Sequence, residues 1–215
     1  IAKATEGWKT KRVLGGPSVW TNPESYKYLG YDMVVGGECD AEESIKRIID
    51  LAEHPNSEHY AFFPVSRTLD WVLPPIRRWN DRYNAHMVDA ASKRYRMTSM
   101  FASRGCPMSC AFCDSGRAGK IWSNLVRFEP LDLVERQMAE AASQGFTGLM
   151  WYDDIMPIQR PRTLAIMELH RKYGLTWRGF MRSDILVKYG KDFFKALVDG
   201  GLIEMFVGVE SADDR

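Results

Sequence analysis

The stretch Phe101-Ala102-Ser103-Arg104-Gly105-Cys106-Pro107-Met108-Ser109-Cys110-Ala111-Phe112-Cys113 decides the fold and the chemistry of this chain. Its three cysteines, Cys106, Cys110 and Cys113, are spaced C-x3-C-x2-C and follow a strand-like run over 97–102. Three thiolates from one loop can hold three irons of a cubane [4Fe–4S] cluster, which leaves the fourth iron open to a small molecule. The spacing therefore predicts an iron–sulfur centre with one exchangeable position.

Zinc is the alternative metal for this loop. Clustered cysteines in a reducing compartment also build structural zinc sites, and some are simply buried thiols. A zinc ribbon usually has two Cys-x-x-Cys pairs, whereas the only other cysteine of this chain is Cys39. A lone cysteine at an expected helix start is more often a passive small residue than a ligand. We favour iron–sulfur and keep a zinc-stabilised, non-redox binding module as the alternative.

Composition excludes several classes of protein. The 215 residues are 45% hydrophobic, which is enough for a sizeable core, and 29 Lys and Arg nearly balance 28 Asp and Glu. This balance argues against a dedicated nucleic-acid surface, and no apolar run is long enough to span a bilayer. Clustered cysteines indicate a metal site in a reducing cytoplasm. Because the chain begins at Ile1 and stops just after a strand-like segment, we expect it to be truncated at both ends.

The chain reads as two α/β domains joined by a linker. Residues 1–56 show strand, loop, strand and helix, with strands at 12–14 and 31–35 and a helix at 41–52. Residues 57–95 are rich in proline and aromatic residues and are expected to form an ordered linker.

Residues 96–215 alternate strands and helices. Strand-like runs span 97–102, 147–152, 176–181 and 203–209, and helical runs span 131–143, 162–173 and 192–198. Repeated βα units predict a parallel sheet, here the first four units of a partial (β/α) barrel. In such barrels the chemistry lies at the carboxyl ends of the strands, which is where the cysteines fall.

The cysteine loop resembles that of the radical S-adenosylmethionine (SAM) superfamily. The likeness rests on Arg104-Gly105-Cys106-Pro107 with Cys110-Ala111-Phe112-Cys113, and it continues at separated points over 98–213. It implies that a [4Fe–4S] cluster and SAM are cofactors, and that Phe112 lies against the adenine of SAM. Simple loop packing is the other interpretation of Phe112.

The resemblance also assigns roles to residues at the later strand ends. Asp153, with Asp154 as the alternative, would receive the amino group of the SAM methionine. Arg182 would bind its carboxylate, and Glu210 of a "G-x-E-S" segment ending at Ser211 would accept hydrogen bonds from the ribose or pair with Arg182. The structural alternatives are a solvated loop or helix cap for the aspartates and ion pairs for Arg182 and Glu210.

The first domain resembles the C-terminal part of the Rossmann-like, cobalamin-binding domain that precedes the barrel in one radical SAM branch. The match runs through Val13-Leu14-Gly15-Gly16-Pro17, Asn22-Pro23-Glu24 and 32–38. It implies that Gly15 and Gly16 let the backbone approach the nucleotide tail of cobalamin, although turns also favour glycine. The Asp-x-His-x-x-Gly motif of that branch is absent from these residues, so cobalamin stays open as a cofactor.

The implied function is reductive cleavage of SAM to a 5′-deoxyadenosyl radical, which abstracts hydrogen from a substrate. With cobalamin the enzyme would be a methyltransferase; without it, the same architecture suits cyclisation, rearrangement or sulfur insertion. The expected partners are a small-molecule or peptide substrate and a flavodoxin- or ferredoxin-type electron donor, with no nucleic acid and no membrane.

Overall fold

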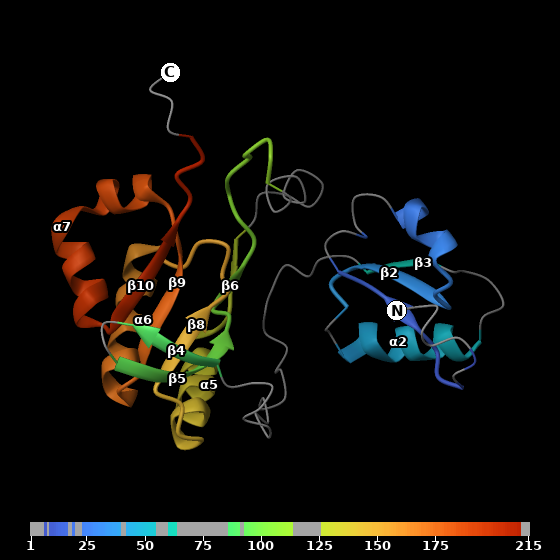
Figure 1. Cartoon of the computed structure of the whole chain (residues 1–215), viewed down its shortest axis with the longest axis horizontal. Coiled ribbons are helices and arrows are strands. Elements are labelled where there is room, and N and C mark those ends of the chain that lie inside the picture. The colour runs from blue at the N-terminus through green and yellow to red at the C-terminus, as the bar shows by residue number, and fades with distance from the viewer. Residues whose placement is uncertain are drawn as a thin grey trace. The chain divides into compact units, whose positions relative to one another are not determined.

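A computed structural model describes residue 7 and residues 9–16, 19, 23–39, 42–54, 60–63, 86–90, 93–113 and 126–211. The chain forms two compact units, which are described separately (Figure 1). One comprises Ile1–Trp71 and Met108–Asn124, and the other comprises Val72–Pro107 and Leu125–Arg215. Among the described residues, no helix is long and apolar enough to cross a membrane.

The first unit contains a parallel three-stranded sheet in the order β1-β2-β3. The strands are β1 (Val13–Leu14), β2 (Met33–Gly37) and β3 (Tyr60–Phe63). A 3-10 helix, η2 (Pro23–Leu29), precedes β2, and α2 (Glu42–Glu53) follows it. All residues of β2 are buried, as expected for the central strand of a parallel sheet.

The described residues of this unit form a small hydrophobic core. Its buried cluster consists of Met33, Val35, Ala61 and Phe63, with Cys39, Ile48 and Leu51 packed against it. Cys39 thus lies at the edge of a hydrophobic core, which agrees with its interpretation as a passive residue. On α2, the apolar residues Ile45 and Ile49 are exposed. The face of α2 that packs on the core is a narrow stripe formed by Ile48, Leu51 and Ala52.

The second unit is built on a five-stranded sheet in the order β10-β9-β8-β5-β4. The parallel strands are β5 (Lys93–Met100), β8 (Gly148–Trp151), β9 (Thr176–Met181) and β10 (Leu202–Val207). At one edge β4 (His86–Ala90) pairs with β5 in the antiparallel sense. The sheet curls into a partial barrel, so the predicted α/β fold class is confirmed.

Three helices follow the parallel strands and cover one face of this sheet (Figure 1). They are α5 (Leu131–Ser143), α6 (Arg160–Tyr173) and α7 (Ser183–Asp199). The last helix begins nine residues before its predicted start, Asp192. The two segments of α7 meet at Gly190, whose φ of 77° is non-helical. This interruption of the helical pattern explains why the sequence predicts only the second segment.

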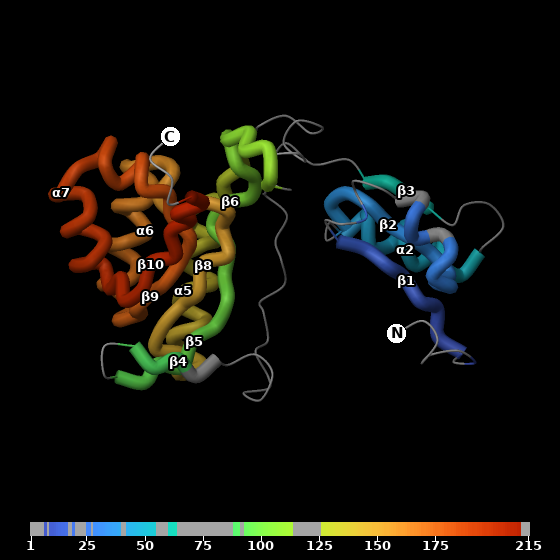
Figure 2. Tube along the Cα trace, turned by 45° about the horizontal axis from the view of Figure 1, so that its top comes forward, coloured from blue at the N-terminus to red at the C-terminus, as the bar shows by residue number. Residues whose placement is uncertain are grey.

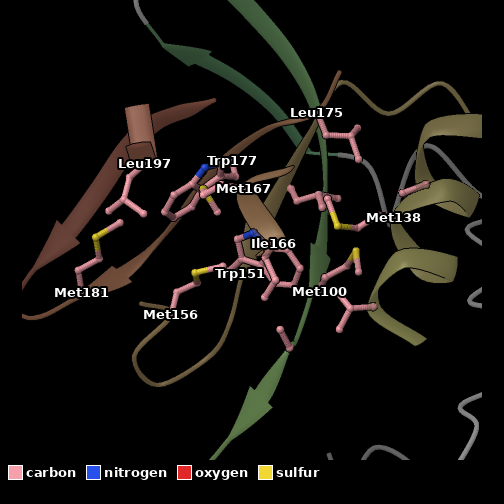
Figure 3. Packing of buried hydrophobic residues seen from close by; sticks show 14 of the residues in the cluster. Met100, Met138, Trp151, Met156, Ile166, Met167, Leu175, Trp177, Met181 and Leu197 are labelled. Atoms are coloured by element: carbon pink, nitrogen blue, oxygen red, sulfur yellow. The ribbon is translucent and has the colours of Figure 1, made fainter. Parts of the chain in front are cut away.

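The main hydrophobic core lies between the sheet and these helices. In Figure 3 the labelled side chains from strands and helices point toward one another around Trp151 and Trp177. Both indoles are fully buried, as are Met167 of α6 and Leu197 of α7. Close packing of such large side chains fixes where each strand ends, and therefore where the following residues leave the sheet.

Part of the expected linker belongs to the two sheets. Residues 60–63 form β3 of the first unit, while residues 86–90 form β4 and residues 93–95 begin β5 of the second. The first two residues of β5, Lys93 and Arg94, are exposed, so this stretch lacks the apolar alternation that predicts a strand. The rest of the expected linker, 57–59, 64–85 and 91–92, lies outside the described residues.

A small hairpin frames the cysteine loop. The strand β6 (Ser103–Arg104) pairs antiparallel with β7 (Arg127–Phe128). The chain after β10 and the start of this loop lie at the same end of the second unit (Figure 2). The cysteine-containing segment therefore begins at the carboxyl edge of the parallel sheet.

Candidate cofactor site

Parallel strands bring the predicted site segments of the second unit to one edge. The segments that follow β5, β8, β9 and β10 begin at Phe101, Tyr152, Arg182 and Gly208, respectively. Because neighbouring strands are in parallel register, their carboxyl ends lie together, as in barrel enzymes. The fold thus gathers the start of the cysteine loop, the aspartates, Arg182 and Glu210 at one edge.

The three cysteines are free thiols, and each is half-buried. Cys106 comes two residues after β6, and Gly105 between them has φ 94°, a left-handed conformation that suits glycine. Further along, the backbone N–H of Cys113 donates to the carbonyl of Cys110 over 3.2 Å. Accessible thiols with no hard oxygen ligands among them fit an iron–sulfur cluster in their donor chemistry.

The cysteine loop is shared between the two units. Cys106 belongs to the second unit, whereas Cys110 and Cys113 belong to the first. Within the described part of the chain, no three His, Cys, Asp or Glu side chains form a group able to hold a metal ion. The ligand set therefore rests on spacing and donor chemistry, and it stays a prediction.

Asp153 is buried at the end of β8, with 2% of its surface exposed. Its Oδ1 accepts a hydrogen bond of 2.5 Å from the hydroxyl of Ser103, and its Oδ2 accepts one of 3.0 Å from the N–H of Ala102. Burial raises the pKa of Asp153 to about 6, although these hydrogen bonds lower it. Both carboxylate oxygens are thus engaged by the segment that leads into the cysteine loop.

Asp154 differs from its neighbour because its side chain is exposed. Residues that alternate along an extended segment point in opposite directions, so one aspartate enters the core while the other faces outward. The prediction that one of this pair receives an ammonium group is not tested by the structure. Burial favours Asp154 as the member that a ligand can reach.

Arg182, directly after β9, forms a two-pronged ion pair with Asp184. Its Nε and Nη2 each lie 3.0 Å from a carboxylate oxygen of Asp184, which lies in the first turn of α7. The pair is partly exposed, and it holds the pKa of Asp184 below its usual range, chiefly through the hydrogen bonds from Arg182. The sequence analysis did not single out Asp184 as a partner of Arg182.

The remaining predicted SAM contacts are exposed. Glu210 has φ 61°, which is uncommon for a residue other than glycine, and Ser211 beside it is also exposed. The Glu210 carboxylate lies beside Gly208, where it occupies the space that a side chain at position 208 would enter. Phe112 is 71% exposed, so it is available to a flat ligand. Their roles as SAM contacts stay predictions.

The two glycines predicted to approach cobalamin each have a conformational explanation. A Cβ on Gly15 would lie 3.0 Å from Cγ2 of Val35, so Gly15 lets β1 approach β2 closely. Gly16 has φ 115° and open space around it, which is typical of a turn. A cofactor role for either glycine is neither required nor tested by these contacts.

A row of aromatic rings across the second sheet was not predicted from the sequence. Phe101, Tyr152, Phe180 and Phe206 form neighbouring pairs, with ring centroids 6.1, 6.5 and 5.3 Å apart along the row. Three of the rings are at least 40% exposed. The alternation in β9, where Trp177 and Met181 are buried and Phe180 is exposed, places this row on the face away from the helices. The alternation of buried and exposed apolar residues near the strand ends could have predicted this row from the sequence.

A partial parallel barrel whose carboxyl edge begins a three-cysteine loop defines an α/β protein with an iron–sulfur donor set. The sequence model of the radical SAM superfamily matches residues 100–215, which is over half of the chain. The chain belongs to the radical SAM superfamily.

Two curated proteins share sequence with this chain. An uncharacterized methyltransferase of Pyrococcus horikoshii is 28% identical over 229 residues, covering 94% of this chain and 46% of that protein. The hopanoid C-3 methylase of Methylococcus capsulatus is 30% identical over 113 residues, covering 52% of this chain and 21% of the methylase. The chain thus spans less than half the length of these relatives.

Solved structures show the same fold. The radical SAM methyltransferase TsrM from Kitasatospora setae, with tryptophan and a SAM analogue bound, aligns with a TM-score of 0.61 at 14% identity. That alignment covers 94% of this chain and 42% of TsrM. A second structure of TsrM, with cobalamin and a [4Fe–4S] cluster bound, gives a TM-score of 0.58 at 13% identity and covers 92% and 41%.

Proposed function

We propose that this chain is the SAM-cleaving part of a radical SAM methyltransferase. The observation that carries the proposal is the position of the cysteine loop, which begins at the carboxyl edge where Asp154, Arg182 and Glu210 also leave the sheet. Membership of the superfamily supports SAM cleavage, and both curated relatives are named as methyl-transferring enzymes.

Cys106, Cys110 and Cys113 would hold the cluster. Bound there and reduced by an external electron donor, a [4Fe–4S] cluster with an open iron would supply the electron for cleavage of SAM into methionine and a 5′-deoxyadenosyl radical. The contribution of the protein is to orient SAM and to exclude water from the reaction.

The methionine part of SAM would be held by two charged side chains. Asp154 is exposed at the strand end and accepts hydrogen bonds from the ammonium group. Arg182 presents a guanidinium that binds the carboxylate through two parallel hydrogen bonds, the geometry it already shows toward Asp184. A carboxylate ligand would therefore compete with Asp184 for Arg182.

The nucleoside part would contact the other exposed residues. Glu210 and Ser211 offer oxygens to the ribose hydroxyls, and Phe112 offers a ring face to the adenine. The row of Phe101, Tyr152 and Phe180 supplies an apolar surface on the same sheet for a small-molecule substrate. This surface favours a substrate with a flat or apolar part.

Cobalamin is proposed as the methyl carrier, bound through the first unit near Gly15 and Gly16. The fold similarity to the cobalamin-bound TsrM structure covers 92% of this chain and so includes that unit. A cobalamin-free cyclase or sulfur-insertion enzyme is the alternative, since fold alone does not fix the reaction. A flavodoxin- or ferredoxin-type donor and a cytoplasmic location complete the proposal, because a reduced cluster needs both an electron source and a reducing compartment.

Anaerobic iron–sulfur reconstitution tests the proposal at its base. The wild-type protein should bind about four irons and four sulfides and absorb at roughly 400 nm. Cys110→Ala should lose this band, whereas Cys39→Ala should keep it because Cys39 lies on the core of the first unit. A colourless protein that holds about one zinc ion would overturn the proposal and favour the zinc-stabilised module.

A further inference from the structure

We propose that Asp153 is a positioning residue, which anchors the segment leading into the cysteine loop to the end of β8 and so fixes where Cys106 leaves the sheet. This inference rests on the proposed function only in giving the loop a cofactor to hold. The anchor itself is a property of the protein without any cofactor.

Both carboxylate oxygens of Asp153 accept hydrogen bonds from the segment that leads into the cysteine loop. Its Oδ1 accepts from the hydroxyl of Ser103 at 2.5 Å and lies 3.2 Å from the N–H of Ala102, whose distance to Oδ2 is 3.0 Å. Asp153, Ala102 and Ser103 are each no more than 3% exposed. Burial removes the hydration of a carboxylate, and this cost must be offset by hydrogen bonds. Here the donors of those hydrogen bonds belong to the segment that leads into the cysteine loop.

The carbonyl of Ala102 is also fixed, by hydrogen bonds from Arg162 and Glu129. Nη2 of Arg162 donates to this carbonyl over 3.1 Å and to the carbonyl of Glu129 over 2.5 Å. The N–H of Glu129 donates to the same Ala102 carbonyl over 3.0 Å. The N–H of Ala102 is therefore held by buried Asp153, and its C=O by buried Glu129 and half-buried Arg162, in contrast with an ordinary solvated loop.

Arg162 also fixes β7 and Glu129, which follow the cysteine loop. Glu129 is buried and accepts a hydrogen bond of 2.9 Å from Gln137 of α5. The guanidinium of Arg162 lies 5.1 Å from the ring centroid of Phe128 in β7. Since β7 pairs with β6, both ends of the loop between Arg104 and Arg127 are tied to the sheet.

These contacts give the two adjacent aspartates different tasks. Asp153 is buried and holds the protein chain, while Asp154 is exposed. Three cysteines must converge within a few ångströms to bind one cluster. If the start of the loop is already fixed, fewer loop conformations are lost when the cluster binds.

Amide hydrogen exchange of the metal-free protein tests the anchor directly. In Asp153→Asn an amide N–H₂ replaces one acceptor oxygen, and in Ser103→Ala the hydroxyl donor is lost. Exchange over residues 101–106 should become about tenfold faster in Asp153→Asn and faster by a smaller factor in Ser103→Ala, with β9 unchanged. The matched control is Asp199→Asn, an exposed aspartate paired with Lys195 at the end of α7, which should exchange as wild type.

A second readout uses the reconstituted protein. At equal iron content, Asp153→Asn should change the electron paramagnetic resonance spectrum of the reduced cluster and release iron to a chelator faster than Asp199→Asn does. An equal rise in exchange over β8 and β9 would overturn the inference, because Asp153 would then be an ordinary core residue. Unchanged exchange together with weakened SAM binding would also overturn it and make Asp153 a ligand residue.

The outcomes separate this inference from the proposed function. If no variant, and not even the wild type, binds a cluster, the exchange data on metal-free protein still decide whether Asp153 anchors the loop. If Asp153→Asn does not fold, Ser103→Ala gives the decision, since wild-type exchange over 101–106 in that variant would contradict the anchor.

Discussion

Trp151 donates its indole N–H to Nε2 of His170 over 3.0 Å, while Nδ1 of His170 lies 2.8 Å from the carbonyl of Leu175. An indole N–H only donates, so Nε2 must be the acceptor and Nδ1 must carry the proton. His170 is 1% exposed, and burial lowers its pKa from 6.5 to about 4. The core of the second unit therefore contains a neutral histidine that links α6 to β8.

This histidine should make stability depend on pH. Since its pKa is lower when folded, the unfolded chain binds a proton first as the pH falls below 6.5, and the stability that neutral His170 provides is lost progressively down to about pH 4. The contribution reaches about 3 kcal/mol. Urea unfolding at pH 7 and pH 4.5 should show a smaller difference for His170→Gln, which keeps a donor and an acceptor but does not titrate. Equal pH dependence in both proteins would contradict this.

Gly37 at the end of β2 should not accept a side chain. Its φ is 88°, and an added Cβ would overlap the carbonyl oxygen of Phe63 in β3. Gly37→Ala should destabilise the first unit by about 3 kcal/mol or more, because both the backbone and the strand pair must shift. Gly16→Ala is the control, with φ 115° but open space, and it should cost about 1–2 kcal/mol in denaturant unfolding. Equal losses would show that the contact with Phe63 is unimportant.

Arg182 should matter for SAM binding and not for cluster binding. Arg182→Lys loses the two-pronged geometry and should raise the KM for SAM about tenfold, with iron content unchanged. Arg171→Lys is the control, since Arg171 pairs with Glu168 on the exposed side of α6. An unchanged KM in Arg182→Lys would assign Arg182 to its ion pair with Asp184 alone.

Asp154 should also matter for SAM binding, because it is proposed to accept hydrogen bonds from the ammonium group of the SAM methionine. In Asp154→Asn the loss of a charge-assisted hydrogen bond should weaken SAM binding about tenfold, measured by calorimetry on the reconstituted protein. Asp199→Asn should bind SAM as wild type. If Asp154→Asn also binds normally, the ammonium is received elsewhere.

Much of the fold of the second unit could be predicted from sequence. Apolar periodicity gave α5 with its observed bounds, and it gave β9 over 176–181. It did not give β4 or the start of β5, where pairing with a neighbouring strand, and not burial, makes the strand. The first segment of α7 was also missed, because Gly190 interrupts its helical pattern.

The candidate site was predictable in position but not in detail. Sequence order alone places Asp153 and Asp154 at a strand end, yet which of them is buried depends on the packing of Ala102 and Ser103 about fifty residues earlier. The contact of Arg162 with Glu129 is likewise a product of tertiary structure, since 33 residues separate them. Local patterns contain no information on such pairs.

The most direct test of the account is the formation of 5′-deoxyadenosine. The reconstituted protein is incubated anaerobically with SAM and dithionite, and the products are separated by chromatography. We predict that the wild type and Cys39→Ala form 5′-deoxyadenosine and that Cys106→Ala, Cys110→Ala and Cys113→Ala form none. A wild-type protein that holds its full cluster and binds SAM, yet forms no 5′-deoxyadenosine, would contradict the central claim.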